Sequence, residues 1–155
     1  MLTRRHLLLG SVALAGAGAA AFFVPRGATA NTTRVYAEDG VALAGTDVVA
    51  YFREGAPVAG SEAHTHDWQG VTWRFASAAN RDAFAADPEA YAPQYGGFCA
   101  WAVSEGYTAP TDPGAWKIVD GKLYLNYSRR IQRRWERDIP GHIAAADANW
   151  PSLLQ

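Results

Sequence analysis

Alternating apolar and polar residues predict a β-hairpin near the middle of the chain. In residues 71–75, Trp73 and Phe75 share one side of the predicted strand and polar residues take the other, which is the period of a strand with one buried face. Residues 64–68 provide the partner strand, and Gln69-Gly70 provides the turn. The pattern therefore predicts a compact hairpin with an aromatic face.

A second hairpin is predicted further along the chain. Residues 116–119 and 122–126 flank Asp120-Gly121, which is a strong signal for a type I′ turn. Nearer the start, residues 35–36 predict a short strand. The apolar segment 41–52 is interrupted by glycine and aspartate, so it predicts short strand or turn elements rather than a long helix.

Capping and breaking residues delimit the predicted helices. Ser77 is placed as an N-cap, and Asp87-Pro88 ends the helix that follows it. The helical segments that we expect are residues 78–86, 88–91, 98–105 and 129–138, with a last stretch to Asn149. The mixture predicts an α+β fold: one small domain with two short β-hairpins and several short helices around an aromatic core.

The first thirty residues have the pattern of an export signal. Arg4-Arg5 precede an apolar run, and Ala28-Thr29-Ala30 has the small-x-small pattern of a signal-peptidase site. The paired arginines favour the twin-arginine route; an ordinary secretory signal and an uncleaved anchor are the alternatives. We therefore expect a periplasmic or otherwise exported protein, with a signal peptide over residues 1–30 and a single domain over residues 31–155.

Composition narrows the classes of function. The whole chain has 15 acidic and 14 basic residues, and removal of the signal takes Arg4, Arg5 and Arg26 with it, which leaves a net charge of −4. This charge argues against general nucleic-acid binding. The chain has one cysteine, Cys99, so no internal disulfide can form, and stability must come from the aromatic-rich core.

Six motifs of the domain together resemble the YHS-domain family, in particular its exported bacterial branch with a twin-arginine signal. They are GTDVVAYF (45–52), W-x-G-x-T-W-x-F-x-S (68–77), F-x-x-D-P-E-x-Y (84–91), YGGFCAWAV (95–103), WKIVDGKLYLNY (116–127) and DIPGHI (138–143). The resemblance covers nearly all of the predicted mature chain. It implies a treble-clef-like module that binds metal ions, notably copper or zinc, and a family better known as a domain than as an activity.

The chain departs from that family at its cysteines. Metal-binding members of the wider family carry one cysteine in a D-P-V-C segment and two in an F-C-x-x-x-C stretch, and these fall here on Ala50, Ala76 and Asn80. Alanine has no lone pair to donate, and an amide is a poor ligand for zinc or copper. A bound metal would therefore need a different set of ligands.

His64, His66 and Cys99 are the candidate metal ligands of this chain. Residues two apart in an extended segment project from the same face, so both imidazoles of His64-Thr65-His66 can reach one ion such as Cu(II) or Zn(II). The alternative is a solvated histidine pair. His142 is a distant fourth candidate, and no spacing links it to the others.

Cys99 has two interpretations. It follows Gly96-Gly97 at the start of a predicted helix, where the helix N-terminus lowers a thiol pKa and favours the thiolate. The alternative is a buried cysteine that packs as a small hydrophobe. The resemblance also makes Asp47, Tyr51 and Tyr95 candidates to line a pocket with Cys99, with a structural hydrogen bond from Tyr51 as the alternative.

One strongly basic patch follows the second hairpin. On a helix, Arg130, Arg133, Arg134 and Arg137 fall near one face, which favours contact with an acidic protein partner or an anionic membrane surface. The alternative is a solvated face that Glu136 and Asp138 partly balance.

Three hypotheses follow. The first is an exported, non-enzymatic domain that handles a transition metal, copper or zinc, through His64, His66 and Cys99. The second is a ligand-free protein-interaction module that keeps the fold and uses its aromatic or arginine surfaces. The third and weakest is a thiol redox protein that uses Cys99.

Overall fold

Two small sheets and six short α-helices make up residues 34–154, the part of the chain that the computed structural model describes. The mixture confirms the α+β class, with two β-hairpins and an aromatic core, that the sequence predicts. The signal peptide predicted over residues 1–30 lies outside the described residues.

The first sheet has the strand order β1-β2-β4-β3. Its strands are β1 (Ala37–Glu38), β2 (Val41–Ala42), β3 (Ser61–Trp68) and β4 (Val71–Phe75). β3 pairs antiparallel with β4, and a register shift between Ser61 and Thr65 bends this edge strand. The buried face of β4 is the predicted one, since Val71, Trp73 and Phe75 are buried and the residues between them are not.

The second sheet is a hairpin of β5 (Asp112–Val119) and β6 (Lys122–Asn126). Its turn is of the predicted type, because Asp120 and Gly121 both have positive φ, at 50° and 74°. The prediction for the first short strand was two residues too early, since β1 begins at Ala37.

The helices begin and end near the residues that the sequence marks. They are α1 (Val48–Arg53), α2 (Ala78–Ala86), α3 (Pro88–Tyr91), α4 (Ala100–Ser104), α5 (Arg129–Trp135) and α6 (Ile139–Asn149), with 3₁₀ turns at Leu43–Gly45, Gln94–Gly97, Glu136–Asp138 and Trp150–Ser152. Ser77 caps α2 as predicted, by accepting a hydrogen bond from the Asn80 N–H. The helix α1 was not predicted, and α4 is shorter than expected.

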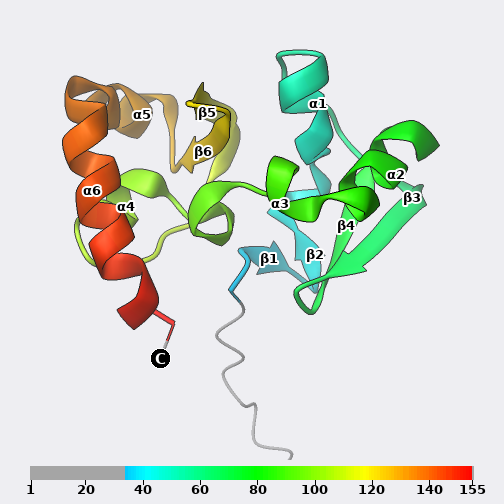
Figure 1. Ribbon diagram of the computed structural model, residues 1–155, viewed down its shortest axis with the longest axis horizontal. Coiled ribbons are helices and arrows are strands. Elements are labelled where there is room, and N and C mark those ends of the chain that lie inside the picture. Colours follow the sequence, from blue (N-terminus) through cyan, green and yellow to red (C-terminus); the bar gives the residue numbers. More distant parts are fainter. Residues whose placement is uncertain (1–33, 155) are drawn as a thin grey trace, which may run out of the picture. The chain divides into compact units, whose positions relative to one another are not determined.

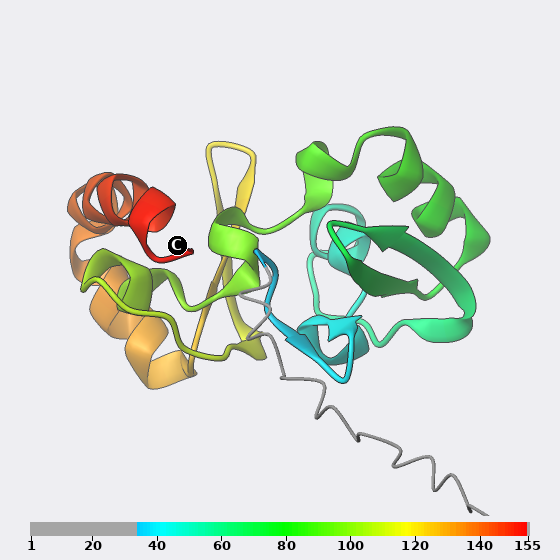
Figure 2. The ribbon, with the colours of Figure 1, turned by 90° about the horizontal axis from the view of Figure 1, so that it is seen from below.

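The hydrophobic residues form two clusters, and β6 belongs to both. One cluster packs β4, α1 and Phe84 together with Leu123 and Leu125, whereas the other packs α4, α5 and α6 together with Tyr124. Figures 1 and 2 show the β5–β6 hairpin between the first sheet on one side and helices α4, α5 and α6 on the other. No helix within residues 34–154 has the length and apolar character needed to cross a membrane.

Candidate functional site

A buried aspartate, Asp47, accepts hydrogen bonds from all three positions at which the family resemblance places cysteines. Asp47 is fully buried and caps α1, since its Oδ1 atom accepts hydrogen bonds from the N–H groups of Val49 (2.9 Å) and Ala50 (3.2 Å). Its Oδ2 atom accepts from the Ala76 N–H (2.9 Å) and from the Asn80 side-chain amide (2.8 Å). Ala50, Ala76 and Asn80 therefore surround one carboxylate.

This cluster keeps no acceptor free for a metal ion. A carboxylate offers about four lone-pair sites, and the four hydrogen bonds to Asp47 use them. The Oδ1 atom of Asn80 accepts from Arg53 Nη1 at 3.0 Å. These residues do not fit the thiolate metal site that the resemblance implies. They form a hydrogen-bonded cluster that ties α1 to the start of α2.

His64 and His66 project from the same face of the edge strand β3. Both are half-buried, whereas the residues on either side of them are exposed. The His66 ring packs edge-on against Phe84, with ring centroids 6.0 Å apart. The Nδ1 atom of His64 is buried and has no hydrogen-bond partner among residues 34–154. The predicted pair is thus in the right relative orientation, and one of its nitrogens is unpaired.

Cys99 is buried immediately before α4. Its side chain is 1% exposed, its Sγ atom accepts from the Tyr127 N–H at 3.2 Å, and the thiol donates to Asn126 Oδ1 at 3.7 Å. Burial raises the pKa of the Cys99 thiol, and the backbone N–H groups around it lower the pKa by less. The expectation of a lowered thiol pKa is therefore wrong, because loss of water outweighs the helix N-terminus.

The predicted metal ligands do not come together. Figures 1 and 2 show β3, which carries both histidines, and α4, which follows Cys99, on opposite sides of the β5–β6 hairpin. Within residues 34–154, no three His, Cys, Asp or Glu side chains are placed to hold one metal ion. His142 lies elsewhere again, with its Nδ1 atom 3.0 Å from Ser104 Oγ.

The structure does not bring Asp47, Tyr51 and Tyr95 to the groove beside Cys99 as expected. The Tyr51 hydroxyl donates to the Pro113 carbonyl at 2.8 Å, which is the structural role named as the alternative. The Tyr95 hydroxyl donates to Asp147 Oδ1, also at 2.8 Å. Neither tyrosine lines the groove that lies beside Cys99.

That apolar groove has a volume of about 210 Å³ and carries the most exposed aromatic residues of the described chain. Its lining residues are Cys99, Trp101, Ala102, Tyr107, Ala109, Tyr127 and Ile131. Tyr107 and Tyr127 are 47% and 58% exposed, and they are the only large hydrophobic side chains exposed among residues 34–154. Arg134 of α5 lies over the Trp101 ring, 5.2 Å from its centroid.

Of the predicted basic patch, Arg130, Arg133 and Arg134 lie on α5, whereas Arg137 lies on the 3₁₀ turn that follows it. All four are exposed, and the acids that follow α5 do not balance them. Glu136 bonds to Lys117 and Gln132 instead, and Asp138 caps α6 through the Gly141 N–H. None of the ion pairs formed within residues 34–154 involves an arginine of α5. The basic face is therefore available to an external anion.

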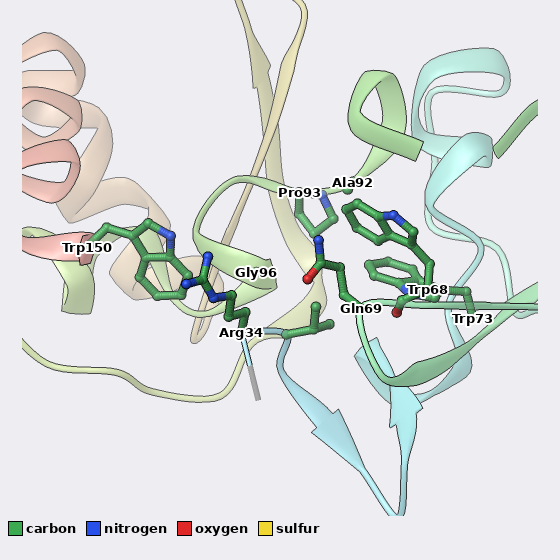
Figure 3. Close-up of a pocket in the computed structure, with 9 residues that line it drawn as sticks. Arg34, Trp68, Gln69, Trp73, Ala92, Pro93, Gly96 and Trp150 are labelled. Atoms are coloured by element: carbon green, nitrogen blue, oxygen red, sulfur yellow. The ribbon is translucent and has the colours of Figure 1, made fainter. Parts of the chain in front are cut away.

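A second cleft lies where the two hydrophobic clusters meet. One part of it has a cavity volume of about 130 Å³ and is lined by Arg34, Val35, Trp68, Gln69, Trp73, Ala92, Pro93, Gly96 and Trp150. An adjoining part shares both half-buried tryptophan walls and adds Glu89, Gln94, Tyr95 and Lys122. Figure 3 shows Trp68 and Trp150 on opposite sides, with the Gln69 side chain between them.

Comparisons of this chain with protein-family models, with curated proteins and with solved structures gave no match.

Sequence reasoning missed two features of these sites. Asp47 stands directly before an apolar run, which is the position of an N-cap, and that signal could have predicted both α1 and the buried carboxylate. The tryptophan-walled cleft joins the β3–β4 turn to residues after α6. No local pattern reports a contact across that separation in sequence.

Proposed function

We propose that this chain is an exported, non-enzymatic YHS-like domain that works as a protein-interaction module. Its partner is an acidic protein segment: an apolar side chain enters the groove beside Trp101, and neighbouring carboxylates pair with the α5 arginines. The observation that carries the proposal is the position of Arg134, which lies over Trp101 and so joins the apolar groove to the basic face.

The contributions of the two surfaces are complementary. Burial of a leucine-sized side chain in the groove is worth about 1.5–3 kcal/mol, and each rim arginine adds about 0.2–1 kcal/mol through its charge. An uncharged partner gains only the free energy of burying its apolar side chain in the groove. Because rim charges act mainly on the association rate, binding should weaken as ionic strength rises.

The test uses random peptides displayed on phage, selected against the domain and then measured as synthetic peptides. We expect enriched peptides to carry an apolar residue beside Asp or Glu. Arg134→Glu should weaken their binding about tenfold, which corresponds to about 1.4 kcal/mol. The matched control is Arg81→Glu on α2, which makes the same charge change away from the groove residues.

Two outcomes would refute this proposal. One is a set of enriched peptides without acidic residues, or peptides that bind Arg134→Glu as well as the unchanged domain. The other is binding to vesicles of anionic lipid with no peptide enriched, which would assign the arginines to a membrane surface.

A second candidate function is binding of Cu(II) or Zn(II) by His64 and His66. The unpaired Nδ1 atom of His64 and the shared face of the two imidazoles favour it. Two protein ligands leave the remaining coordination positions to water or to a partner. Cys99 is left out of this set because it is buried just before α4, and Figure 1 shows α4 across the β5–β6 hairpin from β3.

Calorimetric titration of each ion into the domain tests the histidine site. Binding should be lost in His64→Ala/His66→Ala and kept in both His142→Ala and Cys99→Ser. Equal binding by the histidine double variant and the unchanged domain would end this candidate.

A further inference from the structure

We propose that the cleft between Trp68 and Trp150 binds a short oligosaccharide, with a sugar ring held against the tryptophan faces and its hydroxyls bonded by side-chain amides. This site is separate from the groove beside Cys99 and has different lining residues. The inference does not depend on the interaction module proposed above.

The walls of the cleft are fixed from behind. Trp73, which is buried, donates its indole N–H to the Trp68 carbonyl at 3.1 Å, and the Trp68 ring packs edge-on against Phe84. On the other side, Trp150 packs against Tyr95 and Phe98, with ring centroids 5.9 Å and 6.1 Å apart. Both walls are therefore held in place before any ligand arrives, which reduces the ordering cost of binding.

The floor of the cleft brings two distant segments into close contact. Gly96 has a φ of +61°, and a Cβ atom there would lie 1.7 Å from the Arg34 carbonyl oxygen. The Tyr36 N–H also donates to the Gly96 carbonyl at 2.9 Å. This close approach holds Arg34 at the edge of the cleft, where its side chain lines the same space as Trp150.

Gln69 is an unusual residue for its turn, and its side chain faces the cleft. The turns at Asp39-Gly40, Gln69-Gly70 and Asp120-Gly121 all have positive φ at both positions. Asp is a favoured first residue of such turns because its short polar side chain tolerates the left-handed region, whereas Gln lacks that advantage. Figure 3 shows the Gln69 amide directed into the space between the two tryptophan walls. Backbone strain of this kind is often found at residues whose side chains take part in function.

The polar groups of the cleft favour a sugar over other small ligands. Gln69 and Gln94 each offer an amide that both donates and accepts, as a ring of hydroxyls requires. The ionic groups are Arg34, Lys122 and Glu89, so the site suits a neutral or weakly acidic sugar better than a cationic ligand. An apolar ligand would cover these groups without bonding them, which costs free energy.

The experiment titrates three probes into the full mature domain: the N-acetylglucosamine tetrasaccharide, cellotetraose and maltotetraose. Binding is followed by calorimetry and by tryptophan fluorescence. We expect at least one saccharide to bind and Trp150→Ala to weaken it at least tenfold. Gln69→Asn should keep or raise the unfolding midpoint, because Asn suits the left-handed turn, while it weakens binding by shortening the amide's reach.

The matched control is Trp101→Ala, which removes a tryptophan from the other groove and should leave saccharide affinity unchanged. Far-ultraviolet circular dichroism establishes that each variant is folded. The proposal is overturned if none of the three saccharides binds at millimolar concentration, if folded Trp150→Ala binds as well as the unchanged domain, or if only a planar aromatic probe such as naphthol binds.

Discussion

Removal of the Asp47 carboxylate should be among the most destabilising single changes in this domain. Asp47→Ala leaves four donors without their acceptor, from Val49, Ala50, Ala76 and Asn80. Each buried donor left unsatisfied costs about 1–3 kcal/mol. The four costs are not additive, and some donors will find water, so we expect a loss of about 3–5 kcal/mol in the free energy of unfolding. That is a large fraction of the roughly 5–15 kcal/mol of an ordinary domain.

Urea denaturation followed by tryptophan fluorescence measures this loss. The matched control is Asp87→Ala, because Asp87 also caps a helix but is exposed, and it accepts a longer bond from the Ala90 N–H at 3.3 Å. We expect the control to cost about 0.5–1 kcal/mol. A double-mutant cycle with Asn80→Ala should give a coupling energy of about 0.5–3 kcal/mol. Equal losses in Asp47→Ala and Asp87→Ala, or no coupling, would refute the assignment of this cluster as structural.

Three further predictions concern the thiol, a glycine and alkaline pH. Because Cys99 is buried with a raised pKa, a disulfide reagent should label the folded domain far more slowly than the domain in urea; equal rates would contradict the burial. Gly96→Ala should lower the free energy of unfolding by several kcal/mol, because the new Cβ would clash with the Arg34 carbonyl. Gly40→Ala has open space and should lower it by only about 1–2 kcal/mol, for its positive φ. Equal losses of stability in urea denaturation would count against the close approach. Burial and Glu38 raise the pKa of Tyr36 from 10.0 to about 12, so its stabilising contribution is complete below pH 10 and is lost as the pH rises to about 12. Tyrosinate absorbance and the pH dependence of the unfolding of Tyr36→Phe check this. The prediction is contradicted if Tyr36→Phe loses as much stability as the unchanged domain when the pH rises from 10 to about 12.

The sequence predicted best those elements whose signals are local. The Ser77 cap, the Asp-Pro break and the Asp120-Gly121 turn each act within a few residues, and the structure has all three. The segment 41–52 was harder, because a six-residue helix is too short to show a clear period. Its only strong signal was the Asp47 cap.

The candidate site could be predicted only in part. Periodicity placed His64 and His66 on one face of a strand, which the structure confirms. The position of Cys99 at a helix N-terminus predicted a lowered thiol pKa, and this was wrong. Burial raises the pKa, and burial depends on what packs over the thiol. The cleft walled by Trp68 and Trp150 depends on the packing of distant segments, which a single sequence does not encode locally.

The strand β6 has a consequence for how the domain unfolds. Its leucines, Leu123 and Leu125, point into one hydrophobic cluster, and Tyr124 between them points into the other. Neither cluster can open without exposing one face of the same strand, so the two should melt in a single cooperative transition. A ligand that binds on either side would then protect the whole domain, and the slowest amide protons to exchange should be those of β6.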